Sequence, residues 1–217
     1  MVGRRQGTDV NSDARLLNWR FVVPPSHERL LLLSVDHESV PDAIVPARTA
    51  KELAFALREG PFTGIVVGDL AAWQFIHVDG EGSSELLPRL ISSLTDEGWL
   101  YAGLPGRWSP GALLRGGRFT SRAIERSLRA AGFAEVRTYF ALPSQRCPAY
   151  LVSADRRAEL DYFLSRLFFP YVGSSSPRTA RLKQRLLNWG RWAALRVPHR
   201  VRVALSPGMA VVATRSA

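Results

Sequence analysis

Apolar runs of strand length alternate with amphipathic segments of helix length along the first 150 residues. The clearest run, residues 29–35, contains four consecutive leucines, which is typical of a strand buried on both faces of a parallel sheet. Further strand candidates lie at residues 43–45, 65–67, 99–104, 136–142 and 209–214. Strands that alternate with helices of about ten residues predict an α/β fold with a mostly parallel, doubly wound sheet.

Helix start and stop signals lie between these strands. Thr49 is followed three residues later by Glu52, the spacing of a capping box, so a helix is predicted to begin there. In a second helix the leucines recur every four residues from Leu86, and Gly98 is predicted to end it. Further helices are predicted at residues 12–19 and 120–131.

The last third of the chain breaks this rhythm. An aromatic helix candidate at residues 154–169 and a basic one at residues 178–196 precede the final strand. We therefore divide the chain into three parts. Residues 1–153 form a core, residues 154–202 form a helical, aromatic and basic insertion, and residues 203–217 return to the core as its final strand and tail.

The composition excludes several classes of protein. With 46% apolar residues among 217, the chain can bury a core. Its one cysteine, Cys147, excludes an internal disulfide, and the four histidines lack the spacing of a metal-binding helix, so no metal is expected. No run of about 20 apolar residues could cross a bilayer, and no apolar export signal follows Met1. We expect a cytoplasmic protein without a transmembrane segment.

Two segments carry a family resemblance. Residues 90–105 end in LTDEGWLYAGLP, and residues 130–136 read AAGFAEV. Both look like helix–turn–strand units of class I S-adenosylmethionine-dependent methyltransferases. The resemblance covers roughly residues 12–150 and the tail, and it implies a Rossmann-like fold that binds S-adenosylmethionine. A Rossmann-like domain of another family remains the alternative.

The chain departs from that family where the methyl donor would bind. The resemblance implies a glycine-rich turn after the first strand, because only glycine lets the backbone pass close to the donor. No glycine occurs between Arg29 and Glu59. The acidic residue that the family places at the end of the second strand is also missing, since residues 46–48 read PAR. The resemblance therefore implies a degenerate donor site.

Three residues are the candidates for what is left of a cofactor site. Asp36, Asp69 and Trp73 lie at or just beyond the carboxyl ends of predicted strands, where open α/β sheets place their ligands. Asp69 matches the family position after its fourth strand. The alternative is that the aspartates cap turns and that the Trp73 ring packs in the core.

The net charge of +10 comes almost entirely from arginine. Lysine occurs only at Lys51 and Lys183, a bias typical of GC-rich bacterial genomes, so the charge alone does not predict nucleic-acid binding. A denser patch at residues 178–202 interleaves eight cations with leucines and tryptophans. The candidate partner-binding residues are Phe168, Phe169, Arg185, Trp189, Arg191 and Trp192. The alternative is that these apolar residues pack on their own domain while the arginines are solvated.

These patterns favour a methyltransferase-like pseudoenzyme that acts as an accessory subunit in bacterial specialised-metabolite biosynthesis. What is known of similar proteins implies a partner that is another biosynthetic enzyme, for example a kinase-like one, or a peptide substrate. No catalytic residue is predicted. Two alternatives stay open: an active S-adenosylmethionine-dependent methyltransferase acting on a small molecule, and a nucleic-acid or membrane-surface binder that uses the basic tail.

Overall fold

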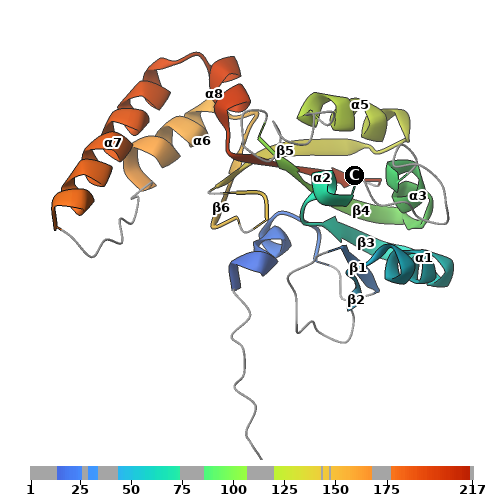
Figure 1. Ribbon diagram of the computed structural model, residues 1–217. Helices are drawn as coiled ribbons and strands as arrows, with labels where there is room; N and C mark the ends of the chain where they lie inside the picture. Colours follow the sequence, from blue (N-terminus) through green and yellow to red (C-terminus); the bar gives the residue numbers. More distant parts are fainter. Residues whose placement is uncertain are drawn as a thin grey trace, which may run out of the picture.

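Seven strands form one mixed sheet in the order β2-β1-β3-β4-β7-β5-β6 (Figure 1). The computed structural model describes residues 14–25, 29–33, 44–73, 86–106, 120–142, 144–146, 148–167 and 177–215. The strands are β1 (Leu30–Leu33), β2 (Ile44–Ala47), β3 (Phe62–Val67), β4 (Leu94–Pro105), β5 (Glu135–Leu142), β6 (Tyr150–Ser153) and β7 (Gly208–Thr214). β1 to β5 run in one direction, and β6 and β7 run against them. The predicted α/β class with a mostly parallel sheet is therefore confirmed.

The two faces of the sheet are covered unequally. The helical elements are η1 (Ala14–Phe21), α1 (Ala50–Glu59), α2 (Leu70–Trp73), α3 (Leu86–Ser92), α5 (Ser121–Ala130), α6 (Arg157–Tyr162), the π-helix η3 (Phe163–Leu167), α7 (Pro177–Arg196) and α8 (His199–Leu205). α1, α2, α3 and α5 bury their apolar side chains in one large cluster on one face. On the other face, Trp19 of η1 lies over Trp99 of β4, with ring centroids 5.9 Å apart.

The leucines of β1 explain why this strand lies inside the sheet. Leu31 and Leu33 belong to the large cluster, whereas Leu30 and Leu32 belong to the cluster on the opposite face. Successive side chains of a strand point to opposite faces, so an unbroken apolar run suits a strand covered on both sides. This prediction from the sequence is confirmed.

Two predicted helix starts are confirmed by their caps. The Thr49 hydroxyl accepts a hydrogen bond from the Glu52 backbone N–H at 3.2 Å. The Glu52 carboxylate accepts from the backbone N–H of Arg48 at 2.6 Å, one residue before the position expected for a capping box. Thr120 caps α5 in the same way, by accepting from the backbone N–H of Ala123 at 3.2 Å.

The predicted helix through Leu94 to Gly98 is wrong in its second half. α3 ends at Ser92, and β4 begins at Leu94. The Arg215 guanidinium donates hydrogen bonds to the carbonyls of Ile91 at 2.9 Å and Leu94 at 3.2 Å. A residue distant in sequence therefore supplies hydrogen-bond donors to the free carbonyl groups at the junction of α3 and β4. Leu94 pairs with β3 and extends the sheet instead of the helix.

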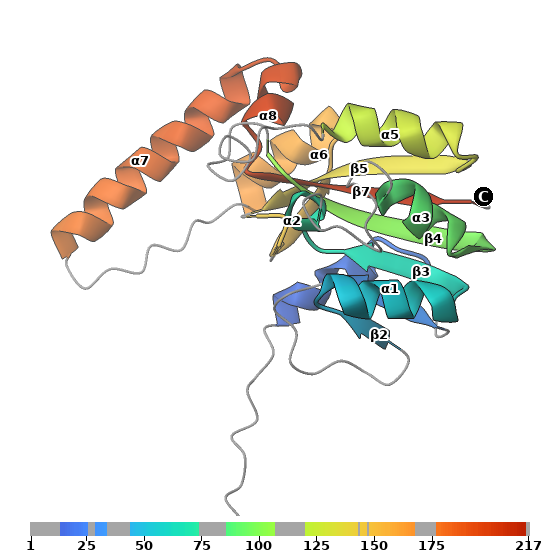
Figure 2. The ribbon, with the colours of Figure 1, turned by 45° about the vertical axis from the view of Figure 1, so that its right-hand side comes forward.

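The chain between β6 and β7 forms a helical insertion that Figure 2 shows extending away from the sheet. The sequence predicted α6 and α7 in outline, although α6 begins at Arg157 rather than at residue 154. It missed α2, α8 and the edge strand β6, which are all seven residues or shorter. Elements of this length carry too few residues to show a clear period.

Arg202 holds the insertion together from inside. Its position in the sequence predicts a place in the basic patch, but its side chain is only 4% exposed. Its guanidinium donates to the carbonyls of Leu195 at 2.9 Å and Val197 at 3.1 Å and forms an ion pair with Asp161. Arg202 thus joins α8 and α6 to the end of α7, and it is structural rather than a surface cation.

Candidate functional site

The carboxyl ends of β1, β3, β4 and β5 lie at the same edge of the sheet, because these strands run in parallel. In open α/β sheets this edge binds ligands. Asp69 lies at this edge between β3 and α2, separated from the end of β3 by Gly68 alone. The prediction that Asp69 lies at the carboxyl edge of the sheet is therefore confirmed.

Asp69 is held by an ion pair. The Nε of Arg146 donates to one carboxylate oxygen of Asp69 at 2.7 Å. The Asp69 side chain is 9% exposed, whereas that of Arg146 is 51% exposed. The backbone carbonyl of Asp69 also accepts from the N–H of Ala72, which starts the turn into α2. Asp69 thus has a structural role at this edge, and contact with a ligand stays a prediction.

The segment 144–146 lies across the carboxyl edge of the sheet. An added Cβ at Gly208, the first residue of β7, would come within 2.4 Å of the Gln145 backbone nitrogen. An added Cβ at Gly103 of β4 would lie 3.3 Å from the Gln145 carbonyl and 2.1 Å from that of Gly68. The two glycines therefore let segment 144–146 pack directly on β4 and β7. This packing places Arg146 beside Asp69, a contact that local sequence spacing could not reveal because the two residues are 77 positions apart.

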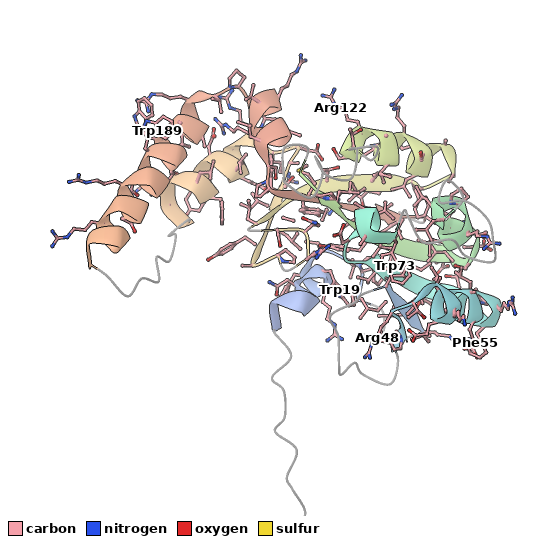
Figure 3. All side chains as sticks on the ribbon, viewed as in Figure 1. Trp19, Arg48, Phe55, Trp73, Arg122 and Trp189 are labelled. Carbon is pink, nitrogen blue, oxygen red and sulfur yellow. The ribbon has the colours of Figure 1, made fainter. Side chains whose placement is uncertain are left out.

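Trp73 lies in the core and does not line a cofactor site. Its side chain is 1% exposed and belongs to the large apolar cluster of the helix-covered face. Figure 3 shows its ring among the side chains between α2 and the sheet. This position matches the alternative in which Trp73 packs in the core.

The resemblance to methyltransferases implies that a methyl donor would bind beside the carboxyl ends of β1 and β2. These strands pair in parallel, with Leu33 opposite Ala47, and only ten residues, 34–43, lie between them. Helical crossovers between parallel strands take a dozen or more residues. Asp36 falls in this connection and lies outside the described residues. Arg48, which is exposed, follows β2 where the resemblance implies an acid.

α7 carries two exposed aromatic side chains of the insertion. Trp189 is 67% exposed and Trp192 is 51% exposed, so neither belongs to the core of its own domain. The Arg196 guanidinium lies over the Trp192 ring, 3.8 Å from its centroid. Arg185 is exposed and Arg191 is half-buried. Phe168 and Phe169 lie outside the described residues.

Neither a metal site nor a membrane span is found in the part of the chain that the structure describes. No group of three or more His, Cys, Asp or Glu residues there could hold a metal ion. No described helix is both long and apolar enough to cross a membrane.

Comparison with known proteins gives structural likeness only. No protein-family model matches the chain, and no curated protein matches it. A SAM-dependent methyltransferase from Archaeoglobus fulgidus aligns over 93% of this chain and 92% of its own, with a TM-score of 0.46 and 13% identity. A SAM-dependent methyltransferase from Thermotoga maritima, a possible histamine N-methyltransferase, aligns over 94% of this chain and 88% of its own, with a TM-score of 0.46 and 12% identity. The α/β fold class follows from the sheet itself and not from these two likenesses.

Proposed function

We propose that this chain is a methyltransferase-like protein that does not use S-adenosylmethionine and that serves as a non-catalytic accessory subunit. The ten-residue connection between β1 and β2 is the observation that carries the proposal. In class I methyltransferases, the turn and helix after the first strand hold the donor. This chain has neither the glycines nor the length for them.

Strand geometry limits what ten residues can form between β1 and β2. A connection from the end of β1 to the start of the parallel β2 must first travel back along four residues, or roughly 13 Å at about 3.3 Å per residue. About four residues of extended chain cover that distance. The remaining six or so residues are too few for two turns of helix at about 3.6 residues per turn. No donor-binding helix of ordinary length fits this connection.

The arrangement at the carboxyl edge supports the same conclusion. Asp69, at the matching family position, is already engaged by Arg146, and segment 144–146 packs on β4 and β7 beside it. The methyltransferase-like part of the proposal is supported by β7, which runs antiparallel between β4 and β5. Class I methyltransferases insert their last strand in the same manner.

An accessory subunit needs a partner to bind. A scaffold without its donor site keeps a role if it binds and positions another component. We propose another biosynthetic enzyme, such as a kinase-like one, or a peptide substrate, in bacterial specialised metabolism. The exposed side chains of Trp189 and Trp192 support a binding role, because large exposed aromatics are typical of interaction surfaces.

Titration calorimetry with S-adenosylmethionine tests the proposal. We expect no saturable binding, because no glycine turn lets the donor approach the backbone beside β1. A dissociation constant of about 10 μM or tighter, roughly −7 kcal/mol, would overturn the proposal and favour an active methyltransferase. In that event Asp69→Asn should weaken binding if Asp69 contacts the donor, and exposed Arg122→Gln is the matched control.

A further inference from the structure

We propose that α7 attaches the protein to an anionic membrane surface through three arginines and two tryptophans. These five residues, which we call the Arg–Trp stripe, are Arg181, Arg185, Trp189, Trp192 and Arg196. The inference goes beyond the accessory role and does not depend on the loss of the donor site.

The spacing of the stripe places its side chains on one face of the helix. Successive members lie four, four, three and four residues apart, and residues three or four apart are neighbours on a helix surface. All five are exposed. Figure 3 shows Trp189 on the side of α7 that is turned away from α6. The stripe is therefore open to a partner along most of the helix.

The net charge of the protein comes from the C-terminal part of the chain, which contains this helix. Residues 162–217 contain ten arginines and lysines and no aspartate or glutamate. Acidic and basic residues are equal in number in residues 1–161, so the last 56 residues supply the entire net charge of +10. A coding preference for arginine would raise its frequency throughout the chain without removing acids from one segment. α7 itself contains six of these cations and no acid, so the complement of its surface is anionic.

Tryptophan beside arginine suits the headgroup layer of a membrane. The Trp ring prefers the boundary between water and hydrocarbon, and an arginine can extend its charge to phosphate while its stem stays in apolar surroundings. The contact of Arg196 with the Trp192 ring at 3.8 Å pairs these two functions within the stripe. Arginine also binds phosphate with two parallel hydrogen bonds.

Two further features favour lipid over nucleic acid. The α8 side chains Val201 and Leu205 are 40% and 58% exposed beside the exposed Arg200. Such aliphatic side chains can enter a lipid layer, whereas contacts to phosphates and stacked bases make no use of them. Proteins that bind single strands through stacking use a basic groove, whereas this stripe lies on a helix that extends from the domain (Figure 2).

Vesicle flotation at low salt tests the proposal directly. Vesicles of phosphatidylcholine and phosphatidylglycerol, mixed at about three to one, should bind the full chain, and vesicles of phosphatidylcholine alone should not. Arg181→Gln with Arg185→Gln should weaken binding about thirtyfold. That factor corresponds to about 2 kcal/mol, or about 1 kcal/mol for each arginine near an anionic surface.

Matched controls distinguish the stripe from charge in general. Arg122→Gln with Arg126→Gln removes the same charge from α5, and Phe55→Ala removes an exposed aromatic ring from α1 (Figure 3); neither should change vesicle binding. Trp189→Ala with Trp192→Ala should weaken vesicle binding at least tenfold. Its melting temperature should stay unchanged, because both rings are exposed.

Four results would overturn the proposal. One is failure of the full chain to bind the anionic vesicles. Another is an equal loss of binding in the α5 control. The third and fourth are stripe-dependent binding to a single-stranded oligonucleotide or to a protein partner without binding to vesicles. If the double tryptophan variant melts several degrees lower, the arginine pair and its α5 control decide the question alone.

Discussion

Three buried donors on the η1-covered face have no hydrogen-bond partner among the described residues. They are the indole N–H groups of Trp19 and Trp99 and the hydroxyl of Tyr101. A buried donor without a partner costs about 1–3 kcal/mol. Burial also raises the pKa of the Tyr101 hydroxyl well above its ordinary value, because the phenolate would lose its hydration. The aromatic rings on this face contribute through their packing and not through their polar atoms.

Tyr101→Phe is therefore expected to retain or increase stability. The substitution keeps the ring and removes a hydroxyl that has no partner among the described residues, so the free energy of unfolding should stay the same or rise by up to about 1 kcal/mol. Urea denaturation of both proteins measures the change. Tyr101→Ala is the control, and it should cost about 3 kcal/mol or more because it leaves a cavity. A loss of more than about 1 kcal/mol in Tyr101→Phe would instead reveal a hydroxyl partner.

At the candidate site, the sequence located one member of an ion pair and missed the other. Asp69 could be placed because a residue that follows a parallel strand lies at the carboxyl edge. Arg146 comes after β5, on the far side of β4 and β7, and the folded sheet alone brings it to Asp69. A single sequence contains no local signal for such a contact.

At the scale of elements, boundaries set by neighbouring residues could be predicted. Thr49 begins α1 and Thr120 begins α5 through caps that reach only three residues along the chain. The boundary between α3 and β4 depends instead on Arg215, more than 120 residues away from the carbonyls of Ile91 and Leu94. The leucine period continues through Leu94, so the helix pattern was present where the chain adopts a strand.

Arg215→Ala should destabilise the junction between α3 and β4. The guanidinium donates to the carbonyls of Ile91, Leu94 and Thr95 at 2.9, 3.2 and 3.1 Å, and each would lose a charged donor. We expect the free energy of unfolding to fall by about 1.5–3 kcal/mol, with partial recovery in Arg215→Lys, which lacks the planar fork of donors. Exposed Arg122→Ala is the control in chemical denaturation. A loss below about 0.5 kcal/mol would show that water replaces these bonds.

At the scale of the whole molecule, the alternation of strands and helices predicted the parallel half of the sheet. It could not predict the order of the strands, because pairing depends on contacts between segments distant in sequence. β7 illustrates the limit. Its apolar residues mark it as a buried strand, but nothing in them indicates that it lies between β4 and β5 and runs against both.

The position of β7 makes the end of the chain essential to the fold. β7 pairs with β4 along its whole length and with β5 on its other side, and it places Met209, Val211 and Ala213 in the large core cluster. A chain that ends after Leu205 would leave the β4 and β5 backbone groups that face β7 unpaired, and it would lose this central layer of the core. Because these contacts join distant segments, the sheet cannot close before the last strand has been synthesised.

A chain truncated after Leu205 should therefore show no cooperative unfolding transition by circular dichroism, and it should aggregate through the two unpaired strands. The matched control ends after Arg215, which keeps both β7 and the guanidinium that caps α3. The control should melt like the full chain. A truncated chain that kept a cooperative transition near the original temperature would show that β4 and β5 pair directly when β7 is absent. In that case β7 would not be needed to join the two halves of the sheet.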